Sequence, residues 1–464
     1  MIRGWRIRSS KWRFCSEDRV SSMSGKRFFV WLLLAAFCLP CRAHAGGQGA
    51  GMEAWSRLEE REAEPTAADK VMGFWSERID VTGWIELLQS VRTHAPHDEV
   101  TSRAHGRLEM KGDFNWLYGF LSMDAEKNWT IPSEDGFSVR EAWLEHVGDG
   151  WDLRLGRQLI IWGKADGVRI TDNICPTDFT EYLNREIDEM RIPVTAAKLR
   201  IMSDTLITEL IWIPEFKPAK LASGDNPWAV DYTAAFPMPV RWRGAKEPSS
   251  YSLKDSEFAA KVSSYMAGFD VSLSAFYTWD DNAANYYSMR AGDTGMEMVL
   301  EPEYHRIMIY GLDFAKPWSD FVFRGEAAYF QGRRLSVDDG QPAKHDVLKS
   351  LLGVDWSPGG NWTITAQVLD DWVVDYRRNL TCEEHTPQAT LNVSKTFFNE
   401  LLTVSDMIYY SMNDGEYFNR LQFSYELGEG LELTVGWDKF QGDDGSYGVY
   451  KRNSQVWGKI RYSF

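Results

Sequence analysis

The chain has 464 residues, 25% of them charged, and a formal net charge of −16 at pH 7. A surface this acidic repels phosphate backbones, so the composition argues against a nucleic-acid partner. The length allows either two or three soluble domains or one large closed barrel.

Residues 1–45 have the composition of an export leader. A basic pair at 26–27 precedes the apolar run FFVWLLLAAFCL at 28–39, and the small-residue pattern AHA follows at 43–45. This order predicts a signal peptide cleaved after residue 45. Because basic residues also lie upstream of Met23, we expect translation to start at Met23; a long n-region is the alternative.

The chain after the leader is more acidic still. The leader holds nine Lys/Arg and two Asp/Glu, which leaves 42 against 65 and a net charge of −23. Such a surface suits cations, or divalent ions that bridge to anionic lipid. Residues 46–78 are polar and helix-prone, and they predict a periplasmic N-terminal extension ahead of a barrel at 79–464.

Segments of about ten residues with alternating apolar side chains begin near residue 79. One hairpin has its apolar row at Leu421, Phe423, Tyr425 and Leu427, turns at Gly428-Glu429-Gly430, and resumes at Leu431, Leu433, Val435 and Trp437. Period-two alternation broken by turn residues is the signature of a transmembrane β-barrel.

Short and long connections alternate along this region. The predicted short turns are 112–115, 148–150, 203–204, 267–268, 316–320, 357–361, 397–400 and 428–430. The predicted loops are 94–101, 127–137, 162–193, 214–255, 280–304, 333–345, 374–386, 412–416 and 442–452. This predicts an all-β, antiparallel barrel of about 18 strands (16–18), with both ends of the barrel on the periplasmic side.

Tryptophans mark the ends of many predicted strands. They are Trp116, Trp151, Trp162, Trp212, Trp279, Trp318, Trp356, Trp362, Trp372 and Trp437. Aromatic rings with a polar atom prefer the headgroup level of a bilayer, so this placement predicts two girdles. A soluble sandwich with buried Trp is the alternative.

The stretch LGRQLIIWGKADGVRITDNICPTDFTEYLNREIDEMRIPVTAAKLR, residues 155–200, differs from its surroundings. Its Gly-Arg-Gln, Trp-Gly-Lys-Ala-Asp, Thr-Asp-Asn, Pro-Thr-Asp-Phe and Arg-Ile-Pro-Val motifs resemble a broad family of uncharacterised porin-like outer-membrane proteins of Gram-negative bacteria. That family is reminiscent of alginate-export barrels. The motifs cover about a tenth of the chain.

The resemblance implies a single-chain channel with an inward-folded loop. It also suggests periplasmic or inner-membrane transport partners. No cofactor is predicted. The predicted function is therefore passage of small solutes across the outer membrane. The alternative is an outer-membrane component of an export or lipid-transfer system.

The alternation in this stretch also raises the question of where the Arg157 side chain lies. Continuing the alternation of Trp151, Leu153 and Leu155 would place Arg157 in lipid, at a cost of roughly 2–4 kcal/mol near the midplane. A β-bulge at Gly156 would turn Arg157 into the lumen. The alternative is that Arg157 lies near the headgroups and snorkels.

The following loop, about 162–193, carries charges of both signs. If it folds into the barrel, these charges narrow the pore and create a transverse field. An exposed loop whose charges pair in water is the alternative. The predicted pore-constriction residues are Arg157, Lys164, Asp166, Arg169, Asp172, Asp178, Arg185 and Arg191.

The sequence gives only weak indications of a disulfide or of a catalytic site. Cys175 and Cys382 remain after the leader, and an exported protein permits a disulfide between them. Aspartate pairs at 280–281, 338–339, 370–371 and 443–444 raise a surface aspartyl-type hydrolase as a further alternative. Their repetition on successive loops favours solvation or cation bridging, so we predict neither a catalytic nor a metal site.

The chain ends in QVWGKIRYSF, with alternate residues apolar. We expect this strand to close the barrel. Tyr462 and Phe464 resemble the C-terminal signal by which the barrel assembly machinery recognises its substrates, although Gly458 lies one place earlier than usual. The predicted environment is outer-membrane lipid and lipopolysaccharide.

Overall fold

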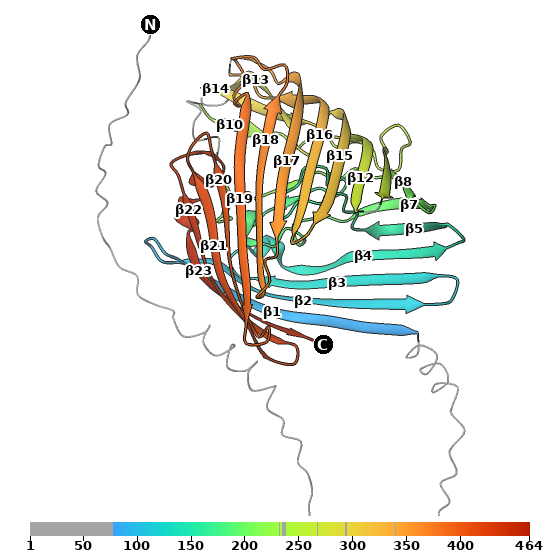
Figure 1. Ribbon diagram of the computed structural model, residues 1–464. Helices are drawn as coiled ribbons and strands as arrows, with labels where there is room; N and C mark the ends of the chain where they lie inside the picture. Colours follow the sequence, from blue (N-terminus) through green and yellow to red (C-terminus); the bar gives the residue numbers. More distant parts are fainter. Residues whose placement is uncertain (1–77, 232, 234–237, 267, 293–294, 339) are drawn as a thin grey trace, which may run out of the picture. The chain divides into compact units, whose positions relative to one another are not determined.

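The strands close into a single barrel. The computed structural model describes residues 78–464 apart from 232, 234–237, 267, 293–294 and 339. In this part of the chain, eighteen strands form one antiparallel sheet whose last strand pairs with its first (Figure 1). The predicted fold class and strand number are confirmed. The predicted leader and the extension up to residue 77 lie outside the described residues.

The barrel strands follow one another in chain order around the sheet. They are β1 (Ile79–Arg92), β2 (Glu99–Asp113), β3 (Tyr118–Asn128), β4 (Gly136–Val147), β5 (Trp151–Gln158), β7 (Val194–Met202), β8 (Leu206–Ile213), β11 (Glu257–Met266), β12 (Phe269–Trp279), β15 (Arg306–Trp318), β16 (Phe321–Leu335), β17 (Ala343–Trp356), β18 (Trp362–Val373), β19 (His385–Phe397), β20 (Leu402–Ser411), β21 (Tyr417–Gly428), β22 (Leu431–Gln441) and β23 (Gln455–Ser463). Short turns and long connections alternate between them, as the sequence predicts.

Two long connections contain strands that the sequence analysis treated as loop. The connection after β12 holds the hairpin β13 (Ala284–Gly292) and β14 (Gly295–Glu303), and β10 (Val240–Trp242) pairs in parallel with β14. These three strands form a sheet outside the barrel wall. Alternation is present there, as at Met296, Met298 and Leu300 of β14, but the whole segment 280–304 was predicted to be one loop.

Short elements complete the described part of the chain. They are β6 (Asp178–Phe179), β9 (Lys220–Leu221), η1 (Pro132–Glu134), η2 (Tyr182–Asn184), α3 (Gly445–Gly448) and η4 (Lys451–Asn453). None of the described helices is long and apolar enough to cross a membrane.

Apolar and polar residues separate onto the two faces of the wall. On β17, Leu352 is 62% exposed on the outer face, whereas its neighbour Leu351 is 2% exposed and faces inward. Strands near the C-terminus repeat this pattern, since Val435 and Val456 are exposed while Asp438 is buried. The outer surface is therefore apolar and the interior carries the charged groups.

The last strand closes the barrel against the first. Outer-face residues meet across this seam, where Ile85 lies opposite Tyr462 and Leu87 opposite Ile460. The backbone of Phe464 exchanges two hydrogen bonds with Gly83. A Cβ at Gly83 would lie 2.6 Å from the carbonyl oxygen of Arg107 and 2.7 Å from the Phe464 ring, so the seam requires a residue without a side chain there.

The interior of the barrel is filled in part by apolar side chains. Ile170, Ile174 and Cys175 come from the β5–β7 connection and pack with inward-facing residues of β7 to β17, such as Leu351. Trp162 also belongs to this cluster and is 4% exposed. The prediction that Trp162 lies in an aromatic girdle is therefore wrong, because its strand has already ended at residue 158.

Candidate functional site

The connection from β5 to β7, residues 159–193, lies inside the barrel; we call it the luminal loop. Its backbone and side chains bond to inward-facing residues of many strands, and two stretches carry most of these contacts. The first arm, residues 162–172, contacts strands from β8 to β20. The second arm, residues 181–189, contacts β2, β3, β4, β21 and β23.

Glu326 on β16 holds the first arm. Its carboxylate accepts hydrogen bonds from the backbone N–H groups of Lys164 and Ala165, and from the N–H and hydroxyl of Thr171 at 3.0 and 2.8 Å. Glu326 is 4% exposed. One buried carboxylate thus satisfies four donors on a loop more than 150 residues away in the sequence.

Further contacts extend the first arm along the wall. The Lys164 ammonium lies 3.0 Å from an Asp313 carboxylate oxygen on β15. Gln367 on β18 donates to the Asp166 carbonyl and accepts from the Asp166 N–H. The Tyr409 hydroxyl on β20 donates to the carbonyl of Gly167 at 2.7 Å. The arm therefore follows the curve of the wall from β15 to β20.

Glu181 holds the second arm. Its buried carboxylate lies 2.7 Å from an Arg103 guanidinium nitrogen on β2 and also pairs with Arg185. Arg185 in turn pairs with Glu126 on β3 at 2.8 Å. Burial alone would raise the pKa of Glu181, but the two guanidinium groups outweigh it and lower the pKa to about 2.

Glu189 adds a second ion pair to this arm. Two guanidinium nitrogens of Arg107 on β2 donate to its two carboxylate oxygens at 2.9 and 2.8 Å. Burial would raise the pKa of Glu189, but the hydrogen bonds and charge of Arg107 lower it to about 2. Arg140 on β4 lies 3.8 Å from the same carboxylate. Two-point contacts of this kind fix the loop in orientation as well as position.

A third group of charges connects the first arm to Arg191, which in turn donates a hydrogen bond to Asp188 of the second arm. Asp172 accepts from Arg191 at 2.8 Å and lies 3.2 Å from Arg169. The Arg169 guanidinium also donates to the carbonyls of Asp172 and Cys175. These three predicted residues therefore lie together, and their charges are paired within the loop.

The other predicted site residues of the luminal loop lie on different parts of it. Lys164 and Asp166 lie on the first arm, and Arg185 lies on the second. Asp178 caps Thr180 and lies 3.5 Å from Lys220 of the next long connection. The loop thus bonds to the wall and to itself, which differs from a loop whose charges pair in open water.

The structure contradicts the β-bulge predicted at Gly156, whereas the alternative that Arg157 lies near the headgroups stays a prediction. Gly156 has a positive φ of 128°, but the pairing of β5 with both neighbours continues through it, so no bulge occurs there. The register shift lies one strand away, between Ser122 and Met123 on β3 opposite Arg140 of β4. The Arg157 Nε donates to the carbonyl of Arg140 at 3.0 Å.

The two cysteines are free thiols in the structure, so the predicted candidate disulfide is not formed. Cys175 is buried, its sulfur accepts from the Ile160 N–H at 3.3 Å, and burial raises its pKa to about 11. Cys382 packs at the edge of the same apolar cluster. Cys175 therefore acts as a small apolar residue of the interior.

Several of the predicted aspartate pairs have structural partners. Asp280 accepts two hydrogen bonds from Arg333, Asp371 lies 2.7 Å from Lys349, and Asp370 lies 2.7 Å from His385. Hydrolysis stays an untested alternative. Within the described residues, no group of three His, Cys, Asp or Glu side chains is arranged to hold a metal ion.

The wall residues that bind the luminal loop were not among the predicted site residues. Glu326, Arg103, Arg107 and Arg420 all stand on inward-facing positions of predicted strands. None of the four has a large apolar residue on both sides, so the alternation gives only a weak signal for these side chains. Which of them faces the luminal loop depends on the barrel register.

The depressed pKa values predict how the second arm responds to acid. The pKa values of Glu181 and Glu189 are lowered from their ordinary 4.5 to about 2. The stability that these two ionised carboxylates give to the second arm is therefore complete above pH 4.5 and is lost as the pH falls toward 2. Hydrogen exchange of residues 181–191, corrected for intrinsic rates, should be unchanged from pH 7 to 5 and should accelerate below about pH 4. Acceleration already between pH 7 and 5 would contradict this prediction.

Comparison with known proteins places the chain in a family. Residues 132–454 match the profile of DUF1302, a family described as protein of unknown function. The chain belongs to this family. The match includes the whole luminal loop and seventy per cent of the sequence. A search of curated proteins gave no match.

Solved structures with a similar barrel have low sequence identity to the chain. Salmonella typhi OmpF in complex with daunomycin is 9% identical, with 83% of this chain and 97% of that chain covered and a TM-score of 0.43. Pseudomonas aeruginosa OccK2 (OpdF) in complex with glucuronate is 11% identical, with 84% and 98% covered and a TM-score of 0.49. The resemblance to alginate-export barrels stays a prediction.

Proposed function

We propose that the protein is an outer-membrane channel for small solutes whose pore is narrowed by the luminal loop. The observation that carries this proposal is a closed barrel with an apolar outer face and a charged interior, crossed by a loop with two anchored arms. Closure pairs every strand edge, which is the condition for a sheet to lie in hydrocarbon. The proposal places the protein in contact with outer-membrane lipid and lipopolysaccharide.

The outer face supports the membrane location. Leu352, Leu273 and Val456 are 62%, 62% and 55% exposed, and they belong to rows that continue around the barrel. Large contiguous apolar surfaces are rare on soluble monomers. A bilayer would cover this surface, whereas water would leave it unfavourably hydrated.

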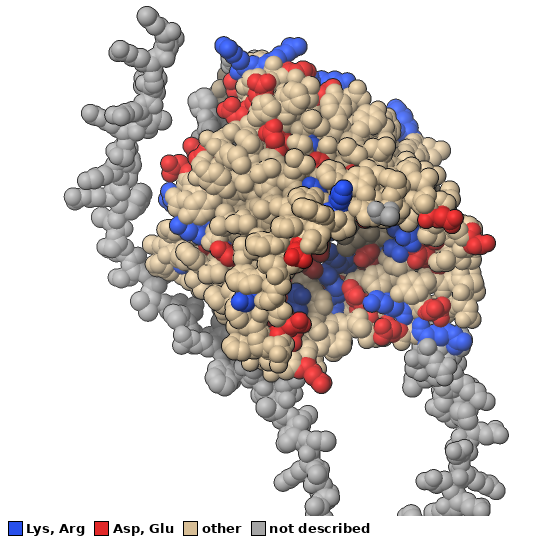
Figure 2. Space-filling view, viewed as in Figure 1, with Lys and Arg blue, Asp and Glu red and all other residues tan. Residues whose placement is uncertain are grey.

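The interior supports passage of polar solutes. Figure 2 shows that one face of the barrel is hollowed and that Lys, Arg, Asp and Glu side chains lie in the hollow. The second arm presents Glu186 and Glu189 toward wall residues that include Lys459 and Arg420. Opposed charges of this kind produce a field across the pore that orients dipolar solutes.

Planar-bilayer recording on purified, refolded protein tests the proposal. We expect discrete, steady conductance steps whose size changes when the anchors of the luminal loop are removed. Absence of steps from both the unaltered protein and the loop variants would contradict the proposal. Steps that do not respond to any loop variant would contradict the role of the loop.

One observation favours a second candidate function. The luminal loop bonds to strands on most sides of the barrel, and apolar clusters fill part of the interior. A barrel occluded in this way would suit a component of an export or lipid-transfer system that opens on contact with a periplasmic partner. Conductance that appears only when such a partner is added would favour this candidate.

A charge on the outer face tests the bilayer contact. Leu352→Arg, in the middle of β17, should destabilise the folded barrel by about 2–4 kcal/mol. Ile201→Arg is the matched control, because Ile201 is 46% exposed on the outer face but lies at the end of β7, opposite Trp151 at the start of β5, where the expected cost is about 0–1 kcal/mol. Urea unfolding in lipid vesicles measures both. Equal effects of the two variants would contradict a lipid-facing β17.

A further inference from the structure

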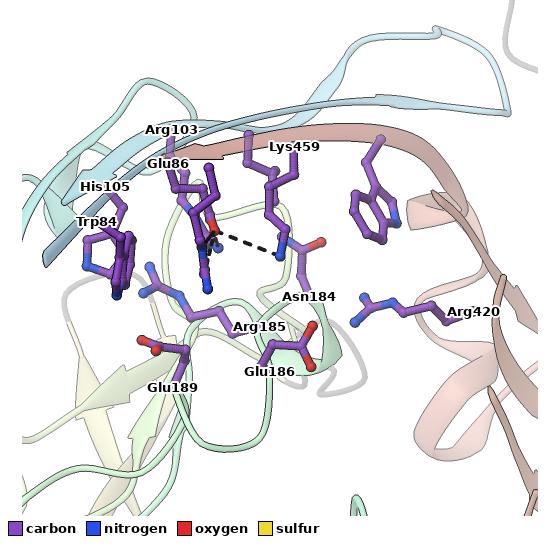
Figure 3. Close-up of a pocket in the computed structure, with 13 residues that line it drawn as sticks. Trp84, Glu86, Arg103, His105, Asn184, Arg185, Glu186, Glu189, Arg420 and Lys459 are labelled. Carbon is purple, nitrogen blue, oxygen red and sulfur yellow. Dashed lines mark hydrogen bonds and ion pairs between the residues drawn. The ribbon is translucent and has the colours of Figure 1, made fainter. Parts of the chain in front are cut away.

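A charged pocket lies between the closing seam of the barrel and the second arm of the luminal loop (Figure 3). The wall supplies residues from β1, β2, β21 and β23, and the loop supplies Asn184 to Glu189. Leu88, Trp84 and Trp457 contribute apolar surface. The lining therefore combines charged groups with apolar side chains.

Three cations in the pocket share one carboxylate. Glu86 accepts from Arg461 at 3.0 and 2.6 Å, while Arg103 lies at 3.6 Å and Lys459 at 3.8 Å. Glu86 is 2% exposed, so these charges lie in a weakly screened environment. The two short hydrogen bonds from Arg461 occupy one of its two oxygens, and Lys459 is the most distant of the three cations.

The network that continues from Glu86 does not balance. Arg103 also pairs with Glu181, and Arg185 joins Glu181 to Glu126. Together the network holds four cations, which are Arg103, Arg185, Lys459 and Arg461, and three carboxylates, which are Glu86, Glu126 and Glu181. One positive charge is therefore in excess.

Lys459 is the cation of this network whose charge is least neutralised and whose ammonium lines the pocket. Its side chain is 14% exposed, and its one ion pair with a described residue is to Glu86 at 3.8 Å, beyond hydrogen-bond distance. Within the described part of the chain, the ammonium donates no hydrogen bond. Figure 3 shows Lys459 extending from the wall toward Asn184 of the loop. An ammonium that is largely buried and lacks a close acceptor is suited to bind an anion.

We propose that this pocket binds small organic solutes through a carboxylate group placed on Lys459. The carboxylate neutralises the excess charge, and the organic part contacts Leu88, Trp84 and Trp457. Glu186 lies on the loop side of the pocket, is exposed, and forms no ion pair among the described residues. It repels an anion, so the carboxylate is directed to the wall and away from the loop. This inference rests on the proposed function only for its role in transport.

Calorimetric titration of the full-length protein in detergent tests the binding without requiring conduction. The probe is benzoate, and benzamide is the neutral control of the same shape. We expect benzoate to bind at least about tenfold more tightly than benzamide. Lys459→Met should weaken benzoate binding about tenfold and leave benzamide unchanged, whereas Lys459→Arg should retain most of the preference.

Lys395→Met is the matched control, because Lys395 stands on β19, lies over the Trp362 ring and does not line the pocket. It should leave benzoate binding unchanged. Equal binding of benzoate and benzamide, or an equal loss with Lys395→Met and Lys459→Met, would overturn the proposal. Selective binding without conductance would refute the proposed channel and leave the site intact. Conductance without selective benzoate binding would refute the binding site and support the proposed channel.

Discussion

Glu326→Ala should release the first arm of the luminal loop and raise the single-channel conductance about twofold or more. The substitution removes the one carboxylate that accepts from Lys164, Ala165 and Thr171. Four loop donors would then lack acceptors in a buried position, and hydrogen bonds to charged groups contribute about 1.5–3 kcal/mol each. The expected loss of stability is therefore about 3 kcal/mol or more, and recording at constant salt measures the conductance.

Asp152→Ala is the matched control for this experiment. Asp152 is also a buried wall carboxylate, but its partner is Arg200 on the neighbouring strand, at 2.8 Å, and not the loop. It should lower stability while leaving the conductance close to that of the unaltered protein. If both variants changed the conductance equally, the effect would come from general loosening of the barrel and not from the loop.

Glu181→Ala should produce the largest loss of stability among changes in the loop. It leaves the Arg103 and Arg185 guanidinium groups, both largely buried, without the carboxylate that they share. Removing one partner of a buried ion pair costs about 3–5 kcal/mol. Urea unfolding in lipid vesicles, followed by tryptophan fluorescence, should show the corresponding shift.

Glu186→Ala is the control for that measurement. Glu186 belongs to the same arm but is exposed and forms no ion pair among the described residues. The free energy of unfolding of the Glu186→Ala variant should stay within about 0.5 kcal/mol of that of the unaltered protein. Similar losses for both variants would contradict the role of Glu181 as the anchor of the second arm.

The barrel was predictable because its rule is local. Side chains such as Leu352 and Leu351 differ in exposure only because neighbours on a strand point to opposite faces. Turn residues interrupt this alternation wherever the chain reverses. At the turn after β21, Gly430 has a φ of 71°, and a Cβ there would lie 2.2 Å from the Ser463 carbonyl oxygen. Strand number and order follow from counting these interruptions.

The β13–β14 hairpin, Trp162 and the cysteines were not predictable in the same way. The hairpin belongs to a sheet separate from the barrel, and its apolar row, Met296, Met298 and Leu300, is too short to distinguish it from a loop. Trp162 follows the last residue of β5 by four positions, and the pattern near it does not show that the chain has already turned inward. Cys175 and Cys382 belong to one apolar cluster but form no disulfide. The positions of two cysteines in the sequence do not show whether they pair.

The sequence by itself determined that the chain forms an antiparallel barrel with a charged loop after its fifth strand, since alternation and turn chemistry act between near neighbours. Only the tertiary structure decided where that loop is held. Glu326 meets Thr171 across 155 positions, and Lys459 meets Glu86 across the closing seam. Such contacts depend on the register and curvature of the whole barrel, because the wall positions are set by every strand pairing between them.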